Sequence, residues 1–458
     1  MIKLACPKCG VPSLRVGALK CPACKTWVGT PPERPPSLRE RAAIAAAVAT
    51  LGALLGGAAV FVGLGAAVSA RFFPPKPPPA APKPPASASA EPATTGEAPK
   101  EAPARAPFGE PRIVRVAAAP LDVAIADDDA TFFILGDDGA VRAYDLATGK
   151  ELRKVNVPGK GSELRLIAGK HLAVLGAVSA LPIIDLATYV VGRIDLGAAA
   201  VDVVPLEDAP SIVAASAGLR KIARFSLDGF RLEGQATLPH TPTGLALARE
   251  PSRDGSPEGS RGLLVVLSSD RSALGMGSVD LIDVAATPFG ASRRTWLAAT
   301  EPRWGFAAEA TAFVVDTSQS RVVAIPTAAG APPLHSAHVD GRPISAHHLA
   351  GGWVVTVNGA GSVTVLEDRT LEPRAMLALG AEPAGAAVTP DGRALLISLG
   401  GSPGERGAMT AVVMGDPPAL AERIPTGPGS RAVRMSKSGR FVAIAAFAGR
   451  SVALLERR

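Results

Sequence analysis

The chain has 458 residues, too many for a single small core, so we expect two or three domains. Its 48 Gly and 43 Pro make up about a fifth of the sequence, a level at which low-complexity segments are expected. Of the net charge of +7, residues 1–41 hold +6, as eight Lys/Arg against two Asp/Glu. The rest of the chain is nearly neutral, which argues against a nucleic-acid-binding face there.

All four cysteines lie near the N-terminus, in two CxxC pairs separated by eleven residues: Cys6, Cys9, Cys21 and Cys24. Two such pairs at this separation let four thiolates meet at one zinc ion, and four ligands close the site. The first pair is followed by Gly10, which suits the left-handed backbone of a knuckle turn. The segment resembles the zinc ribbon family, apart from Lys25 where a second glycine is common. We expect residues 1–30 to be a ribbon folded by structural Zn²⁺, in preference to a disulfide or a redox-active pair.

An uncharged run of 29 residues, 42–70, exceeds the roughly 20 residues that a helix needs to cross a bilayer. Ser37 and Glu40 have capping-box spacing, so the predicted transmembrane helix with its juxtamembrane start covers residues 38–70. The excess of Lys/Arg before the run predicts a cytoplasmic N-terminus and an extracytoplasmic C-terminal part. This is the topology of a single-pass protein of the inner (cytoplasmic) membrane in a bacterial envelope.

Two alternatives concern this helix. Gly52 and Gly56 form a small-xxx-small pair that would let two copies pack as a homodimer, whereas the same composition also suits a plain anchor. Residues 68–70 fit a signal-peptidase site, so cleavage after Ala70 is the alternative to an uncleaved anchor. We expect the uncleaved form, because the apolar run is longer than that of a signal peptide and a folded-looking module precedes it.

Residues 71–111 contain 13 prolines in 41 positions and few apolar side chains, which predicts a disordered Pro/Ala-rich linker. In polyproline II form such a chain is stiff and extends by about 3.1 Å per residue. It would hold the next domain up to roughly 100 Å from the membrane.

The remaining residues, 112–458, repeat with a period close to 40 residues. The clearest unit reads as four strands separated by the turns DDD, DDG and ATG, at residues 121–126, 131–135, 140–146 and 151–157. The last of these turns recurs in the next unit, where Asp185 follows Asp145 by 40 residues. A four-stranded unit of this length is the signature of a β-propeller blade, whose sheet is buried on both faces.

The units predict a mainly β fold with eight blades. Seven units are complete and the eighth has only three strands, so the isolated strand at 112–118 is expected to pair in the last blade and close the ring. A seven-bladed ring is the alternative, because the atypical units around residues 299–340 allow another division.

The stretches TPDGRALLISLG (389–400), SKSGRFVAIAAF (436–447) and VRAYDLATGKELRKV resemble the repeats of bacterial YVTN/WD40-like propellers. In that family a PDG turn joins the first two strands of a blade, and a D…TGK turn joins the last two. The resemblance covers roughly 340 residues. It implies the fold and indicates no particular activity.

One of these stretches also resembles the docking motif AxDxxTGKxxW of quinoprotein dehydrogenases, eight-bladed propellers that bind pyrroloquinoline quinone and Ca²⁺. The matching residues are Ala143, Asp145, Thr148, Gly149 and Lys150. Arg153 replaces the Trp, DLAT recurs only once, and the acidic site and vicinal cysteines of that family cannot be placed. Because Asp and Thr-Gly also suit a tight hairpin turn, we expect no enzyme, no catalytic residues and no organic cofactor. A quinoprotein-like enzyme is the alternative.

Other candidate chemistry is weak. Four histidines lie close in sequence, but neighbouring side chains on strands diverge, so we expect loop or rim histidines and no metal site: His335, His338, His347 and His348. The acidic runs at 127–129 and 137–139 lack the spacing of a calcium loop and suit turns. The GGSPG match at 400–404 continues into Pro403 and a polar loop, where a nucleophile elbow needs a helix.

Without a catalytic constellation, the propeller is expected to be an extracytoplasmic scaffold that binds an unknown protein or glycan. Loops 268–278 and 400–408 both join second and third strands, so they are expected on one face, the first face to test for ligands. A transmembrane regulator that signals through the zinc ribbon is a further alternative. Nucleic-acid binding is not expected, because the predicted topology by itself explains the basic N-terminal flank.

Overall fold

The computed structural model describes residues 3–4, 14–15 and 108–457, the last range without 178, 207–208, 251–260, 270–276, 292, 297–300, 309, 329–334 and 401–405. Strands β1 (Lys3–Leu4) and β2 (Leu14–Arg15) form a short antiparallel pair in the N-terminal unit. The four cysteines, the predicted helix at 38–70 and the linker up to residue 107 lie outside the described residues. In the described part of the chain, no helix has the length and apolar character that a membrane crossing requires.

The C-terminal unit consists of eight antiparallel sheets, named here blades 1 to 8, and in blades 1 to 6 the four strands follow one another in chain order. Blade 1 contains β4 (Pro120–Ile125), β5 (Thr131–Gly136), β6 (Ala140–Asp145) and β7 (Glu151–Asn156). Blade 2 contains β8 (Glu163–Ile167), β9 (His171–Leu175), β10 (Ala180–Asp185) and β11 (Val191–Asp195). Blade 3 contains β12 (Ala200–Pro205), β13 (Ser211–Ser216), β14 (Lys221–Ser226) and β15 (Leu232–Thr237). Blade 4 contains β16 (Thr241–Glu250), β17 (Arg261–Ser269), β18 (Ser278–Asp283) and β19 (Arg293–Trp296).

Blade 5 contains β20 (Pro302–Ala308), β21 (Thr311–Asp316), β22 (Arg321–Pro326) and β23 (His335–His338). Blade 6 contains β24 (Pro343–Leu349), β25 (Trp353–Asn358), β26 (Ser362–Glu367) and β27 (Pro373–Ala378). Blade 7 contains β28 (Pro383–Val388), β29 (Ala394–Leu399) and β30 (Ala408–Val413), and its outer position is shared by β31 (Ala419–Leu420) and β32 (Ile424–Pro425). Blade 8 contains β33 (Ser430–Met435), β34 (Phe441–Ala446), β35 (Ser451–Glu456) and β3 (Arg112–Arg115).

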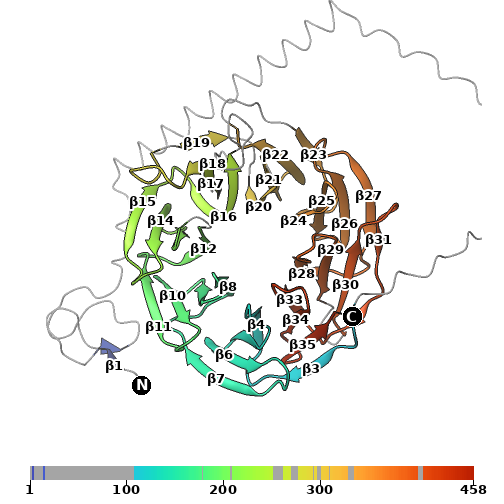
Figure 1. Ribbon diagram of the computed structural model, residues 1–458, viewed down its shortest axis with the longest axis horizontal. Helices are drawn as coiled ribbons and strands as arrows, with labels where there is room; N and C mark the ends of the chain where they lie inside the picture. The colour runs from blue at the N-terminus through green and yellow to red at the C-terminus, as the bar shows by residue number, and fades with distance from the viewer. Residues whose placement is uncertain are drawn as a thin grey trace, which may run out of the picture. The chain divides into compact units, whose positions relative to one another are not determined.

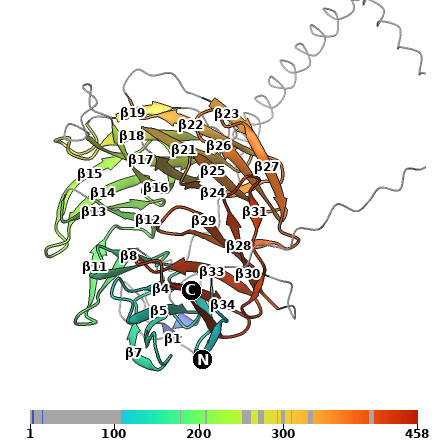
Figure 2. The same cartoon turned by 45° about the vertical axis from the view of Figure 1, so that its right-hand side comes forward.

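The blades are arranged in a ring around an open axis, with the first strand of each blade innermost and the last at the rim (Figure 1). This confirms the mainly β fold and the eight-bladed prediction, and the seven-bladed alternative was wrong. Figure 2 shows the same ring obliquely, with β33 and β4 side by side where the end of the domain meets its beginning. The first and last blades are therefore in contact, which closes the ring.

The ring is closed by two segments from opposite ends of the domain. Strand β3 pairs antiparallel with β35, with Val114 opposite Val452, so the outer strand of blade 8 comes from the start of the domain. A bridge between Phe108 and Arg457 extends this pairing. Blades 8 and 1 then share one apolar cluster, in which Phe132 stacks on Tyr144 at 5.1 Å between ring centroids.

Burial falls from the middle of each blade to its rim. Every residue of β13 and β29 is buried, because the sheet packs against a neighbouring blade on both faces. The outer strands β7 and β15 are exposed at most positions. This explains why middle strands such as β29 are continuous apolar runs, while the outer strand β7 has charged residues at Glu151, Arg153 and Lys154.

The two loops that were expected on one face, 268–278 and 400–408, are both attached at the end of the sheet where the inner strand begins. In blade 4 the start of β16, at Thr241, pairs with the end of β17, at Ser269. In blade 7 the start of β28, at Pro383, pairs with the end of β29, at Leu399. The loops that follow β17 and β29 therefore leave the sheets where the inner strands begin, although most of each loop lies outside the described residues.

Candidate functional site

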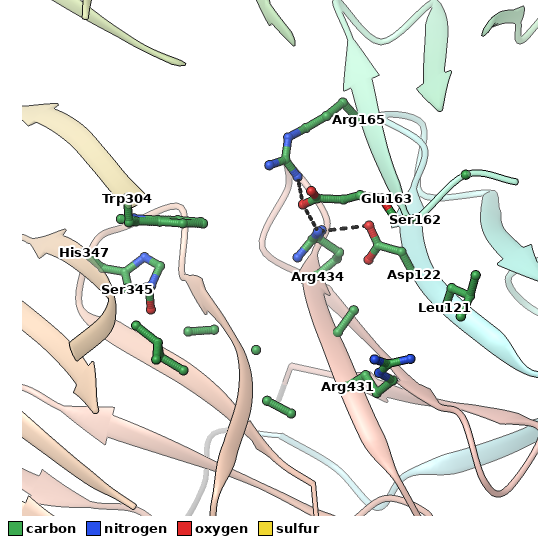
Figure 3. A pocket seen from close by; sticks show the side chains of 16 residues that line it. Leu121, Asp122, Ser162, Glu163, Arg165, Trp304, Ser345, His347, Arg431 and Arg434 are labelled. Atoms are coloured by element: carbon green, nitrogen blue, oxygen red, sulfur yellow. Dashed lines mark hydrogen bonds and ion pairs between the residues drawn. The ribbon is translucent and has the colours of Figure 1, made fainter. Parts of the chain in front are cut away.

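A cavity of about 590 Å³ lies on the propeller axis, bounded by residues of the inner strands and of the segments that precede them (Figure 3). Six blades contribute to it, and the two sides differ in chemistry. The charged wall comes from β4, β8 and β33 and consists of Asp122, Glu163, Arg165, Arg431 and Arg434. The neutral wall comes from β20, β24 and β28 and consists of Trp304, Ile344, Ser345, His347, Ala384, Gly385 and Ala386.

The charged wall is an ion-pair network that runs across four blades. Arg434 of blade 8 lies 3.0 Å from the carboxylate of Asp122 in blade 1 and 3.2 Å from that of Glu163 in blade 2. Glu163 also accepts a hydrogen bond from Arg165, whose Nε lies 3.7 Å from Asp202 of blade 3. Each of these two arginines therefore serves two carboxylates from neighbouring blades.

The carboxylates of Asp122 and Asp202 also join adjacent inner strands. One oxygen of Asp122 accepts the backbone N–H of Val123, and the other accepts the N–H of Leu164 on β8, each at 2.9 Å. Burial raises the pKa of Asp122 above its ordinary value of 3.8, while Arg434 opposes the rise. A buried carboxylate with two backbone donors and an arginine is a fully partnered group, so its role here is to hold blades 1 and 2 together.

Asp202 repeats this arrangement two blades further on. Its oxygens accept the N–H groups of Val203 and, in blade 4, of Leu245, each at 2.9 Å. Burial raises the pKa of Asp202 as well, and Arg165 opposes the rise. The recurrence indicates that an aspartate near the start of an inner strand is an architectural device of this ring.

The neutral wall presents an aromatic side chain in a fixed orientation. The indole N–H of Trp304 donates to the carbonyl of Ala346 at 2.8 Å, and its ring lies 5.6 Å from that of His347. Trp304 is 36% exposed and Ile344 is 38% exposed, which sets them apart from the buried apolar side chains of the blades. Figure 3 shows Trp304, His347 and Ser345 on the side of the cavity that faces the ion-pair network.

His347 is uncharged at neutral pH. Its Nε2 lies 3.2 Å from the hydroxyl of Ser345, and burial lowers the pKa of the imidazole to about 4. The neutral wall is therefore uncharged throughout, whereas the wall that faces it carries formal charges at every named residue.

Blade 7 lines the cavity with small residues, so the space between the two walls stays open. A Cβ on Gly385 would lie 2.5 Å from the carbonyl oxygen of Arg431. The hydroxyl of Ser398 donates to that same carbonyl at 2.8 Å and lies 3.3 Å from the carbonyl of Gly385. Glycine is thus required by the close approach of β28 to β33.

The four histidines singled out from the sequence lie on two strands, one at the rim of the ring and one at its axis. His335 and His338 are on the outer strand β23, which agrees with the expected rim placement. His347 and His348 are on the inner strand β24, so placing them on a loop or the rim was wrong. They diverge as expected, since His348 lies 3.1 Å from Asp368 rather than facing the cavity wall of His347. Within the described ranges no group of three His, Cys, Asp or Glu side chains could hold a metal.

The motif shared with quinoprotein dehydrogenases forms the turn between the third and fourth strands of blade 1. One oxygen of Asp145 accepts both the backbone N–H and the hydroxyl of Thr148, each at 2.7 Å. These bonds, above all that from the Thr148 hydroxyl, hold the pKa of Asp145 below its usual value. Asp185 and Thr188 form the same turn in blade 2. The residues Asp145 and Thr148 thus have a complete local role as turn residues.

The sequence did not single out any residue of the two walls except His347. The usable signal was the occurrence of Asp122, Glu163, Asp202 and Trp304 near the beginnings of the first strands in otherwise apolar units. That signal becomes visible only after the strands have been aligned by blade.

Comparisons with known proteins agree with this architecture. No family model matches the chain, and no curated protein matches it. Among solved structures, the C-terminal WD40 domain of Sif2 is similar, with a TM-score of 0.58 and 9% identity over 76% of this chain and 98% of that one. The computationally designed Ika8 protein has a TM-score of 0.57 and 11% identity, over 76% of this chain and all of that one. The WD40 repeats of RRP9 have a TM-score of 0.50 and 14% identity, over 78% and 99% of the two chains.

At these identities the likeness shows the fold alone. The chain contains an eight-bladed β-propeller with WD40-like structural neighbours.

Proposed function

We propose that the propeller is a non-catalytic scaffold that binds a protein ligand at the axial cavity. The observation that supports this is the pair of exposed apolar side chains, Trp304 and Ile344, among the residues that line the axial cavity. Rigid aromatic side chains next to apolar ones are typical anchors of protein interfaces. The carboxylates of the charged wall are already partnered, which leaves them poorly placed to act as general bases.

Site-specific photo-crosslinking in the host cell tests this proposal. A benzophenone amino acid at position 344, in the full-length chain, is expected to yield a cross-linked adduct with one discrete protein. The matched control is the same residue at position 376, because Met376 is 65% exposed on the outer strand β27. Equal adducts from both positions, or none from position 344, would contradict binding at the cavity.

We further propose that residues 1–30 form a cytoplasmic zinc ribbon and that residues 38–70 anchor the chain in the membrane, with the propeller outside. The sequence supports this through its two CxxC pairs, its uncharged run of 29 residues and the positive charge that precedes the run. Gly52 and Gly56 would then provide a contact between the helices of two copies.

Because the chain has four cysteines, all before residue 25, thiol labelling tests both the topology and the zinc. In cells with a permeabilised outer layer, a membrane-impermeant maleimide is expected to leave all four unlabelled. After lysis, labelling should stay slow until a zinc chelator is added, since bound thiolates are shielded. A Met376→Cys variant supplies the positive control, because its added thiol would face outward. Rapid labelling of the native cysteines in unlysed cells would refute the topology.

A further inference from the structure

Resting on the proposed binding at the cavity, we propose that its ligand is a peptide segment that carries a carboxylate beside an apolar side chain. The guanidinium of Arg431 takes the carboxylate, and the surface of Trp304 and Ile344 takes the apolar group. The chemistry that recognises the ligand is thus an anionic group and an apolar body.

The charges inside the network leave Arg431 as the group available to an anion. Arg434 and Arg165 share three carboxylates, those of Asp122, Glu163 and Asp202. Asp202 is not a lining residue, so the charged groups that line the cavity are three arginines and two carboxylates. Arg431 forms no ion pair with any carboxylate in the described parts of the chain, and its side chain is exposed. Its guanidinium is therefore an uncompensated positive charge among the lining residues.

The side chain of Arg431 is also held in place. Its guanidinium lies 5.2 Å from the ring centroid of Phe447. The backbone of Arg431 is fixed separately, because its carbonyl accepts the hydroxyl of Ser398. Contact with an aromatic face orients a guanidinium while leaving N–H groups at its edge for an anion. An oriented arginine loses less freedom on binding than a fully mobile one.

The distribution of residues around the ring places the two contacts within reach of one peptide segment. Blade 7 lies between blade 6, which carries Ile344, and blade 8, which carries Arg431. Its contribution to the lining is small, since residues 384–386 are Ala, Gly and Ala. Both Ile344 and Arg431 are second residues of their strands, so they lie at the same end of the cavity.

The same observations argue against a cationic ligand. A cationic group entering this end of the cavity would meet Arg431 with no free carboxylate beside it.

Three phenylalanine derivatives test the charge preference in mildly acidic solution: N-acetyl-phenylalanine, N-acetyl-phenylalanine amide and phenylalanine amide, which are anionic, neutral and cationic. The first two differ only in the carboxylate or amide group, whereas the third also lacks the acetyl group. Binding to the full-length protein in detergent is followed by saturation-transfer NMR, with empty micelles as the blank. We expect the anionic probe to bind about fivefold more tightly than the neutral one, as one charge-assisted contact allows. The cationic probe should bind most weakly.

Single-residue variants test which side chains cause the preference for the anionic probe. Arg431→Gln should remove the preference for the anion, and Arg431→Lys should keep part of it. Trp304→Ala should weaken the anionic and neutral probes by a similar factor. Arg374→Gln is the matched control, because Arg374 lies on the outer strand β27 and pairs with Glu367 there. Unchanged thermal unfolding of each variant shows that the ring is intact.

Equal binding of the anionic and neutral probes, or a preference that survives Arg431→Gln, would overturn the inference. If the adduct from position 344 still forms in that case, the proposed protein binding stands and only the carboxylate is wrong. If no adduct forms from position 344, the proposed function itself fails, whatever the probes show.

Discussion

Replacing Asp122 with alanine is expected to lower the free energy of unfolding by about 3 kcal/mol. The substitution leaves the N–H of Leu164, a residue that is 1% exposed, without its acceptor across the boundary between blades 1 and 2. It also removes one of the two carboxylates that Arg434 contacts from blade 8. Chemical denaturation of the full-length protein, followed by circular dichroism, measures the change.

Asp122→Asn separates the hydrogen bonds from the charge. Asparagine retains one accepting oxygen but no negative charge, so one of the two backbone N–H groups loses its partner. Because burial already raises the pKa of Asp122, the charge is itself costly in this site. We therefore expect a smaller loss for asparagine, about 1–2 kcal/mol.

The two controls for this prediction come from the same ring. Asp202→Ala should cost a similar amount, because Asp202 joins blades 3 and 4 through Leu245 in the same way. Asp228→Ala should change stability by less than about 0.5 kcal/mol, since this side chain is 92% exposed in a surface ion pair. If Asp122→Ala and Asp228→Ala had equal effects, the carboxylate would not join the blades as described.

The fold could be predicted from the sequence more fully than the candidate site. The residues that determine the strands and turns lie close together in the chain, whereas those that form the cavity lie far apart. The strands of the first blade could be predicted because turns such as that of Asp145 and Thr148 are local and recur with the repeat. Strand β3 could be assigned to the last blade because the eighth unit lacked a fourth strand. Both inferences use only the period and the turn residues.

The cavity depends on contacts that no local pattern contains. Asp122 and Arg434 are 312 residues apart and meet because the ring closes. Trp304 faces the axis because it stands where β20 shifts register against β21, between Pro302 and Trp304. The same shift occurs in blades 1, 3, 4, 6 and 7, so the alignment of bulges, rather than the residue type, determines which side chains line the axis.

The second large effect is expected on acidification, through His347. Burial lowers the pKa of this imidazole from 6.5 to about 4 in the folded protein. Between these two values the unfolded chain binds a proton that the folded protein does not, so stability rises with pH across this window and falls on acidification. From about pH 7.5 to about pH 5, His347 should account for a loss of about 1–2 kcal/mol, given that its side chain is partly accessible to water.

His347→Gln isolates this contribution, since glutamine has no titration and can still reach the hydroxyl of Ser345. The variant should lose less stability than the wild type over the same pH interval, as measured by denaturant titrations at each pH. Met376→Gln, on the exposed outer strand β27, introduces no titrating group and should leave the pH dependence unchanged. Two carboxyl groups affect stability in a more acidic pH range. The pKa values of Asp138 and Asp391 are lowered in the folded protein. The stability that these groups contribute is therefore lost only as the pH falls below their ordinary pKa of 3.8. The contribution of Asp122 to stability changes with pH in the opposite direction. Its pKa is raised in the folded protein, so this contribution increases as the pH falls.

The outcome that would contradict the prediction is a pH dependence of stability that is identical in the wild type and His347→Gln. It would show that the imidazole at the axis is hydrated enough to titrate normally, and that the neutral wall becomes cationic in mildly acidic solution.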